Sequence, residues 1–239
     1  MTTKRSLEVC YSPISYPLFK NNDAIVVVID IFRATSAICT ALYHGATSII
    51  PVATVGQALD YKLKGYMAAA ERHGEVVPGF EFGNSPFSYM GEGVKGKTIV
   101  LTTTNGTQAV EVSKEAYKVV IGSFLNLSVL SQWVQKQDRD VVLLCAGWKN
   151  KFNLEDTLFA GAMAQKLIHS GNYNNSCDTT QAAIHLYETG KSDLYKFLEN
   201  SSHRKRLEKL NLERDIKYCL ELDLTPVIPV LDGIAILKL

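Results

Sequence analysis

The stretch AIVVVIDI, residues 24–31, decides the fold class of this chain. Six apolar residues, five of them β-branched, precede a single acid, Asp30. A continuous apolar run of this length is typical of a strand that is buried on both faces of a parallel sheet. The next segment, TSAICTALYHGA (35–46), is rich in helix formers and reaches Gly45, which predicts a helix end. A buried strand that leads into a helix is the building unit of α/β proteins.

The same alternation continues along the chain. Two residue pairs, Thr54 with Gln57 and Asp178 with Gln181, have the spacing of a helix capping box. We expect further strands at 48–54, 65–71, 98–104, 117–123, 140–147 and 226–237, and further helices at 58–64, 107–115, 126–137 and 155–169, with mainly helical structure after residue 178.

Strands that alternate with helices pair in parallel through right-handed crossovers. The sequence therefore predicts an α/β fold, a single three-layer α/β/α unit over residues 1–239 with a mostly parallel sheet. Pro226 and Pro229 favour an edge position for the last strand, because proline has no N–H for a sheet ladder.

VVVIDIFRATSA and TIVLTTTNGTQA both combine a strand, a polar loop and a Thr-x-Ala helix start. This pseudo-repeat, around 25–55 and 97–123, is either a trace of two related α/β halves or a short coincidence.

Composition excludes several classes of function. The 239 residues carry 25 basic and 24 acidic side chains, a net charge of +1, which argues against nucleic acid as a partner. No apolar run reaches the roughly 18–20 residues of a membrane span, and no signal peptide is recognisable, so we expect no membrane association. The five cysteines are scattered without a C-x-x-C pair, which favours reduced thiols and a cytoplasmic location. A homodimer is the commonest assembly for such a protein.

Polar residues gather after the predicted strands. In open parallel sheets, ligands bind beyond the carboxyl ends of the strands, so these residues are expected to share one rim. They are Asp30, Arg33, Thr35 and Ser36 after the first strand, Glu71 and Arg72 after the third, Thr104, Asn105, Gly106 and Thr107 after the fourth, Ser123 and Asn126 after the fifth, and Glu155 and Asp156 after the sixth.

The residue types on this rim suit a phosphorylated acid bound beside a metal ion. Carboxylates are the oxygen ligands that Mg²⁺ prefers, helix starts offer backbone N–H groups to anions, and arginine grips phosphate or carboxylate with two N–H groups. Each residue also has a structural interpretation. Asp30 can cap a helix or pair with Arg33, Glu71 can pair with Arg72, and acids such as Glu155 complement the dipole of any helix.

Common phosphatase signatures are missing. No cysteine has an arginine six positions later, and Asp30 lacks the second acid of a D-x-D motif. GEGVKG (91–96) precedes a strand where a nucleotide-binding loop would follow one. His73 lies in an Arg-His-Gly triplet similar to that of histidine phosphatases, but it follows the third strand where that signature follows the first. The basic segment HRKRLEK (203–209) has the spacing of a solvated helical face, with an anion clamp as the alternative.

Several blocks taken together resemble one family. IDIFRATSAICTALYHGA, PVATV, the Glu71-Arg72 pair, PGFEFGNSP (78–86), TIVLTTTNGTQA, IGSFLN, CAG…FNLEDTLFAGA and DIKYCLELD resemble the 2-phosphosulfolactate phosphatases, in order over residues 8–231. The resemblance implies a Mg²⁺-dependent phosphatase that converts (R)-2-phospho-3-sulfolactate to 3-sulfolactate and phosphate, a step toward coenzyme M. Its substrate would be a small phosphorylated anion.

The resemblance also implies roles for individual residues. Asp30, Arg33, Glu71, Asn84, Ser85, Asn105, Ser123, Glu155 and Asp156 stand at the polar motif positions of the family. With the rim residues, this predicts a catalytic set of Asp30, Arg33, Glu71, Asn105 and Glu155, a metal set of Asp30, Glu71, Glu155 and Asp156, and a substrate-binding set of Thr35, Ser36, Arg72, Asn84, Ser85, Thr104, Gly106, Thr107, Ser123 and Asn126.

Two questions stay open at this level. The nucleophile is either Asp30 or a metal-bound water. The substrate is either 2-phosphosulfolactate or another small phosphorylated hydroxy acid, and a non-catalytic sensor of such a metabolite is a further alternative. One departure bears on the substrate: where relatives tend to read H-G-R-R-L, this chain has His203-Arg204-Lys205-Arg206-Leu207. Lysine lacks the planar fork of arginine.

Overall fold

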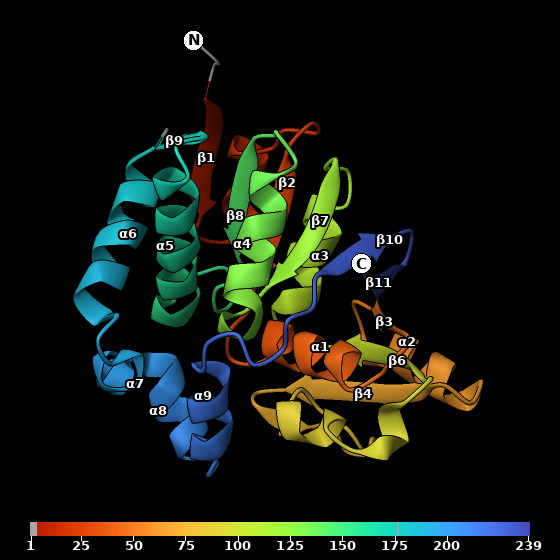
Figure 1. Ribbon diagram of the computed structural model, residues 1–239. Helices are drawn as coiled ribbons and strands as arrows, with labels where there is room; N and C mark the ends of the chain where they lie inside the picture. The colour runs from red at the N-terminus through yellow and green to blue at the C-terminus, as the bar shows by residue number, and fades with distance from the viewer. Residues whose placement is uncertain (1–3, 176) are drawn as a thin grey trace.

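The computed structural model describes residues 4–175 and 177–239, which form a sheet of eleven strands with helices on both faces (Figure 1). The spatial order of the strands is β5-β4-β6-β3-β11-β10-β7-β2-β8-β1-β9. Their bounds are β1 Arg5–Cys10, β2 Ile25–Ile29, β3 Ser48–Pro51, β4 Met67–Arg72, β5 Glu75–Val76, β6 Thr98–Thr102, β7 Lys118–Gly122, β8 Val141–Cys145, β9 Tyr173–Asn175, β10 Pro229–Asp232 and β11 Ala235–Lys238.

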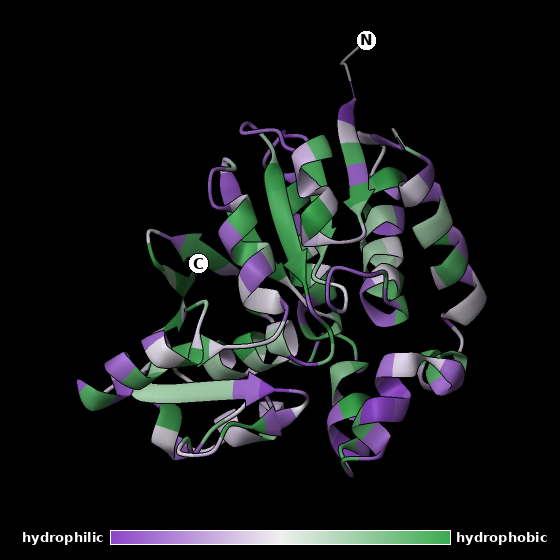
Figure 2. Ribbon diagram, turned by 180° about the vertical axis from the view of Figure 1, so that it is seen from behind, coloured by the Kyte–Doolittle hydropathy of each residue, from purple (hydrophilic) through white to green (hydrophobic). Residues whose placement is uncertain are grey.

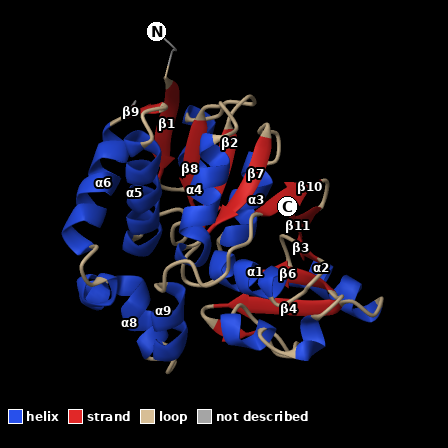
Figure 3. Ribbon diagram, in the orientation of Figure 1, coloured by secondary structure: helices blue, strands red, loops and turns tan. Residues whose placement is uncertain are grey.

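Helices connect and cover these strands (Figure 3). The α-helices are α1 Ala34–Tyr43, α2 Val55–Leu63, α3 Gly106–Ser113, α4 Leu127–Gln135, α5 Leu154–His169, α6 Asp178–Gly190, α7 Leu194–Phe197, α8 Ser202–Glu208 and α9 Glu213–Cys219. Short 3₁₀ helices are η1 Pro13–Leu18, η2 Pro86–Tyr89, η3 Glu92–Val94, η4 Phe124–Asn126 and η5 Leu198–Asn200.

The sheet consists of two parallel blocks joined by an antiparallel hairpin. One block is β7-β2-β8-β1-β9 and the other is β3-β6-β4, and all pairs within each block are parallel. The hairpin of β10 and β11 lies between them, with Val230 of β10 opposite Val120 and Ile236 of β11 opposite Ile49. In Figure 1, β1, β8, β2 and β7 run nearly upright, whereas β4 runs across the view.

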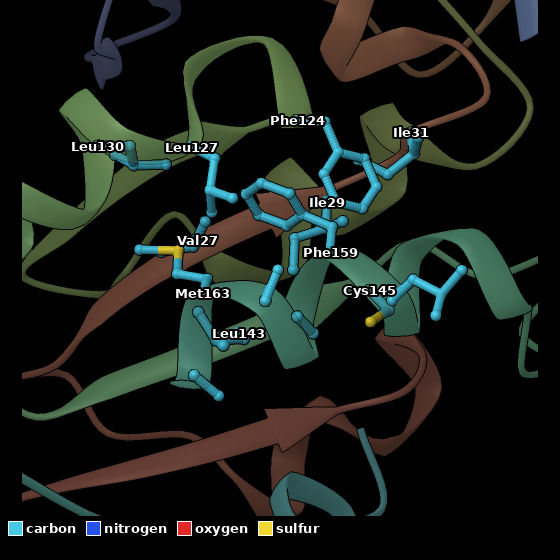
Figure 4. Close-up of a cluster of buried hydrophobic side chains, with 14 of the residues drawn as sticks. Val27, Ile29, Ile31, Phe124, Leu127, Leu130, Leu143, Cys145, Phe159 and Met163 are labelled. Atoms are coloured by element: carbon cyan, nitrogen blue, oxygen red, sulfur yellow. The ribbon is translucent and has the colours of Figure 1, made fainter. Parts of the chain in front are cut away.

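Strand β2 shows why the fold has three layers. Val27 and Ile29 belong to one buried cluster, together with Phe159 of α5, whereas Val26 and Val28 belong to a second cluster, with residues of α1 and α3. Successive side chains of a strand point to opposite faces, so β2 is buried on both sides. Figure 4 shows the first cluster, in which Phe124 and Phe159 lie beside the side chains of β2. The predicted three-layer α/β fold is confirmed.

Most predicted elements are present, and one of the two predicted capping boxes is confirmed. Thr54 Oγ1 accepts the Gln57 N–H at 3.1 Å, and Gln57 Oε1 accepts the Thr54 N–H at 3.1 Å. The predicted box of Asp178 is wrong, because Cys177 is the N-cap of α6 and makes no side-chain capping bond. Strand β1 was not predicted, since polar and apolar residues mix in RSLEVC.

The predicted edge position of the last strand is also wrong. Residues 226–237 do not form one edge strand: residues 229–238 fold into the β10–β11 hairpin inside the sheet. Pro229 is accommodated there because β10 pairs with β7 only at Val230. The missing N–H of proline therefore leaves no gap in a long ladder.

The five cysteines, all in the described part of the chain, are free, and four of them are buried. Over residues 4–175 and 177–239, no helix combines the length and apolar composition that crossing a bilayer requires. The expected homodimer, the pseudo-repeat, the cytoplasmic location and the absence of a nucleic-acid partner stay predictions.

Close packing of α5 on α6 predicts a sensitive position at Gly161. A Cβ atom there would collide with the carbonyl oxygen of Ala183 in α6 and lie 2.9 Å from Cβ of Tyr187. We expect Gly161→Ala to lower the free energy of unfolding by about 1–3 kcal/mol, measured by denaturant melts, because backbone must shift to make room.

Gly56→Ala is the matched control. Gly56 is exposed in α2, and its added Cβ would have only Thr54 Oγ1 nearby, at 3.8 Å. This substitution should leave stability unchanged or raise it by up to about 1 kcal/mol, the helix preference of alanine over glycine. Equal effects of the two substitutions would contradict the proposed close packing.

Candidate active site

A polar cavity lies where the carboxyl ends of β2, β4, β6 and β8 approach helix α8. It encloses about 20 Å³, room for roughly one water molecule. It adjoins a larger pocket of about 330 Å³, with which it shares Arg33, Gly74 and Asn84. The cavity is lined by Asp30, Phe32, Arg33, Glu71, His73, Gly74, Asn84, Thr104, Asn105, Trp148, His203, Arg206 and Leu207.

Asp30 is fixed at the end of β2 by the start of α1. Its carbonyl oxygen accepts the Thr35 N–H at 3.0 Å and the Thr35 hydroxyl at 2.9 Å. A Cβ on Gly106 would lie 2.8 Å from Asp30 Oδ2, so glycine at that position leaves room for the carboxylate. The pKa of Asp30 is raised to about 7, mainly by burial; His203 lowers it, and the Glu71 and Glu155 carboxylates contribute to the rise.

Glu71, at the end of β4, joins two loops of the cavity. Its Oε1 accepts the Gly74 N–H at 2.6 Å, and its Oε2 accepts the Thr104 N–H at 3.2 Å. Arg72 turns away: its guanidinium donates to the Glu71 carbonyl at 2.6 Å and to Thr102 Oγ1 at 3.0 Å. In Figure 2, β4 is pale along its length and ends in a hydrophilic arrowhead. Of these two neighbouring residues, Glu71 lines the cavity and Arg72 does not.

Glu155 is a fully buried carboxylate at the start of α5. Its Oε1 accepts from His203 Nδ1 at 2.5 Å and from Asn153 Nδ2 at 3.0 Å. Its Oε2 has no hydrogen-bond partner among the described residues. A buried carboxylate oxygen without a donor is costly, which indicates that a further group completes this site.

Asp156 has a different environment from Glu155. Its Oδ1 accepts the Ile31 N–H at 2.8 Å, and its Oδ2 accepts the Gly147 N–H at 3.1 Å and Asn153 Nδ2 at 2.9 Å. Burial raises the pKa of Asp156, as do Asp30 and Glu155, and the N–H donors oppose this effect. Both oxygens are used to hold backbone, so Asp156 positions the loops after β2 and β8.

Arg33 is held by a buried ion pair. Its Nη1 donates to Asp215 Oδ2 at 2.5 Å and its Nη2 donates to the Gly74 carbonyl at 2.6 Å. Its Nε is buried without a partner among the described residues. The peptide bond between Phe32 and Arg33 is cis. Arg33 therefore offers one N–H to a bound anion, with its position fixed from two sides.

Only some of the other predicted site residues line this cavity or the pocket beside it. Thr104 and Asn105 line it, and Asn105 Oδ1 accepts the Lys149 N–H at 3.0 Å. Asn84 lines it as well as the larger pocket, where Ser85 lies. Thr35, Ser36, Ser123 and Asn126 are fully buried and bonded to backbone or to one another, and Thr107 donates to the Thr103 carbonyl. Contact of these residues with substrate stays a prediction.

Four residues that line one side of the cavity were not predicted from the sequence. Trp148 follows β8, and His203, Arg206 and Leu207 come from α8. The solvated-face interpretation of HRKRLEK is wrong, because His203, Arg204 and Leu207 are buried. The available signal was the apolar Leu207, four residues after His203, because residues four apart lie on the same face of a helix.

The residues present fit a magnesium ion that is completed by substrate. Within residues 4–175 and 177–239, no three His, Cys, Asp or Glu side chains form a ready-made metal cluster. Mg²⁺ in phosphate-processing sites commonly uses only one or two carboxylates, with substrate phosphate and water as the other ligands. Asp30 lines the cavity, and Glu155, which does not line it, has an unpartnered Oε2 and lies close enough to raise the pKa of Asp30. A cation bound beside Asp30 would reduce the repulsion between these two carboxylates.

Carboxylates, arginine donors and a helix start at one sheet edge are the features expected of an enzyme of α/β fold that acts on a phosphorylated anion. The sequence matches the family model described as 2-phosphosulpholactate phosphatase over residues 10–233, and the chain belongs to this family of phosphoric monoester hydrolases. Three similar proteins carry the name probable 2-phosphosulfolactate phosphatase. That of Thermotoga maritima is 42% identical over 213 residues, covering 89% of this chain and 91% of its own.

The other two relatives come from different bacteria. The protein of Caldanaerobacter subterraneus subsp. tengcongensis is 40% identical over 210 residues, covering 86% of this chain and 87% of its own. That of Gloeobacter violaceus is 38% identical over 209 residues, covering 85% and 86%. The resemblance inferred from the sequence motifs is confirmed.

The buried ion pair of Arg33 with Asp215 predicts a strong stability effect. Asp215→Asn would leave the Arg33 charge buried without a counterion, and we expect the free energy of unfolding to fall by about 3–5 kcal/mol. Denaturant melts followed by circular dichroism would measure this. The double variant Arg33→Met with Asp215→Leu should recover much of the loss, because both buried charges are gone.

Asp138→Asn supplies the exposed control. Asp138 pairs with Arg5 at 2.7 Å, but its side chain is 81% exposed. Its substitution should cost less than about 1 kcal/mol. If Asp215→Asn were equally mild, the buried pair would not be holding Arg33 in place.

Proposed function

We propose that this chain hydrolyses the phosphomonoester of a 2-phospho-hydroxy acid, with (R)-2-phospho-3-sulfolactate as the preferred substrate and 3-sulfolactate and phosphate as products. The observation that carries the proposal is the cavity lined by Asp30, Arg33 and Arg206, in which Nε of Arg33 and Nη2 of Arg206 are buried without a partner among the described residues. Glu155 does not line this cavity, but its carboxylate is close enough to raise the pKa of Asp30. Acids for a metal and N–H donors for anions are the two parts that phosphoryl transfer requires. The names of the relatives support the choice of substrate.

We also propose that Asp30 and Glu155 hold Mg²⁺. The ion would neutralise phosphate charge and polarise the phosphorus–oxygen bonds. Glu71 and Asp156, whose oxygens already accept backbone N–H bonds, position this pair. The bonds to Glu71 and Asp156 hold the loops on which Asp30, Thr104 and Gly147 lie.

Residues of the chain supply the remaining chemistry. The N-terminus of α3, beginning at Gly106, and the Nε of Arg33 would bind the non-bridging phosphate oxygens. Nδ1 of His203 donates to Glu155, so Nε2 can give a proton to the leaving oxygen when the ring is in its doubly protonated form. Asp30 acts either as nucleophile or as the group that orients water.

Phosphate release tests the proposal directly. The protein should release phosphate from racemic 2-phospho-3-sulfolactate in the presence of Mg²⁺, faster than from 3-phosphoglycerate or phospholactate, and EDTA should stop the reaction. Asp30→Asn should lower kcat by at least about 100-fold, because a group in contact with the reacting phosphate is lost.

The outcomes separate the alternatives. Release from the other phosphorylated acids alone would keep the phosphatase reaction and overturn the preferred substrate. Tight binding without release would favour the sensor. Transfer of labelled phosphate to Asp30 would identify a nucleophile, whereas oxygen from labelled water in the phosphate of a single turnover, with no labelled enzyme, would identify attack by water.

A further inference from the structure

Of the three consecutive cations in helix α8, Arg206 lines the cavity. Arg204 is held outside it, with Nε donating to Glu208 Oε1 at 2.6 Å. Lys205 is exposed, and its Nζ donates to Asn200 Oδ1 at 2.8 Å. Arg206 is the member of this group that lines the cavity. The three consecutive cations therefore have different environments, although the sequence presents them as one basic run.

Arg206 is held in place but not paired. Its guanidinium lies 4.2 Å from the ring centroid of Trp148, a cation–π contact that fixes the plane of the group. Its Nη1 also donates a long hydrogen bond to Ser202 Oγ, at 3.4 Å. Its Nη2 is buried and has no partner among the described residues, and no ion pair of Arg206 is present there. A buried guanidinium N–H without an acceptor is costly, which points to a ligand.

Arg33, the other arginine of the cavity, differs from Arg206 because a carboxylate pairs with it. The Asp215 carboxylate forms an ion pair with Arg33, whereas Arg206 has no carboxylate within ion-pair distance among the described residues. The Glu155 carboxylate is close enough to raise the pKa of Arg206, against the larger effect of burial, which lowers it. A substrate with a phosphate and a second acidic group carries more negative charge than the phosphate site alone balances. Arg206 is the arginine of the cavity whose charge is left to balance that second group.

The two arginines also approach the cavity from different sides. Arg33 follows β2 and bonds to Gly74, next to β4, whereas Arg206 comes from α8, which lies across from the end of β4 in Figures 1 and 3. A phosphate at the start of α3 would lie on the side of the strands. The second acidic group of the same molecule would then extend toward α8.

We propose that Arg206, supported by Trp148, binds the non-phosphate anion of the substrate, its carboxylate or sulfonate, and thereby selects phosphorylated acids over simple phosphomonoesters. This inference rests on the proposed function and names the residue that determines its substrate class. A planar guanidinium that is fixed on an aromatic ring suits two-point contact with the oxygens of such a group.

Competitive inhibition separates the two anion sites. For the whole protein with Mg²⁺, 3-sulfolactate and inorganic phosphate would each be tested as inhibitors of 2-phospho-3-sulfolactate hydrolysis. Arg206→Ala should weaken inhibition by 3-sulfolactate about 10- to 100-fold, the effect of losing one or two charge-assisted hydrogen bonds, and should change inhibition by phosphate much less. Arg206→Lys should give an intermediate loss, because lysine keeps the charge without the fork.

Lys205→Ala is the matched control, since it removes an exposed cation from the same helix, and its inhibition constants should equal those of the unaltered protein. Equal weakening of sulfolactate and phosphate inhibition by Arg206→Lys would overturn the assignment, and so would no weakening at all. Failure of the unaltered protein to release phosphate from any phosphorylated acid would instead overturn the proposed function. Melting curves of each variant would identify any that fails to fold, and the lysine variant then provides the test.

Discussion

Asp156 stands in the first turn of α5 and accepts N–H bonds from Ile31 and Gly147, the residues that continue the chain beyond β2 and β8. Through these bonds one carboxylate fastens the ends of two neighbouring strands of the sheet. Asp30 immediately precedes the first of these residues, and Trp148 immediately follows the second. The acid at the base of the cavity and the aromatic support of Arg206 therefore depend on the same buried side chain.

Buried carboxylates cluster at and beside the cavity. Burial and the neighbouring carboxylates oppose ionisation of Asp30, and Glu155 has an oxygen without a donor. A buried carboxylate without enough hydrogen-bond donors destabilises the folded state. It keeps its position only because the surrounding structure holds it there. Bonds from backbone N–H groups to Glu71 and Asp156 provide that rigidity. The site is thus ordered before any ligand binds.

The sequence predicts the strand-end part of this site well, because the carboxyl ends of parallel strands meet at one edge. Asp30, Glu71 and Asn105 could be placed on that rim from strand patterns alone. His203 and Arg206 could not, because they belong to a short helix far along the chain whose position depends on tertiary packing. The β10–β11 hairpin was misplaced for a related reason: pairing with β7 and β3 is a long-range choice that local residue preferences do not encode.

The hairpin that joins the two blocks is the last part of the described sheet to leave the ribosome. Until residues 229–238 emerge, β7 and β3 each present an open edge to the cell, although their other neighbours have already been translated. Open edges recruit strands from other chains. A nascent or prematurely terminated chain of this protein would therefore expose two unpaired strand edges between its two parallel blocks, where strands of other chains can add.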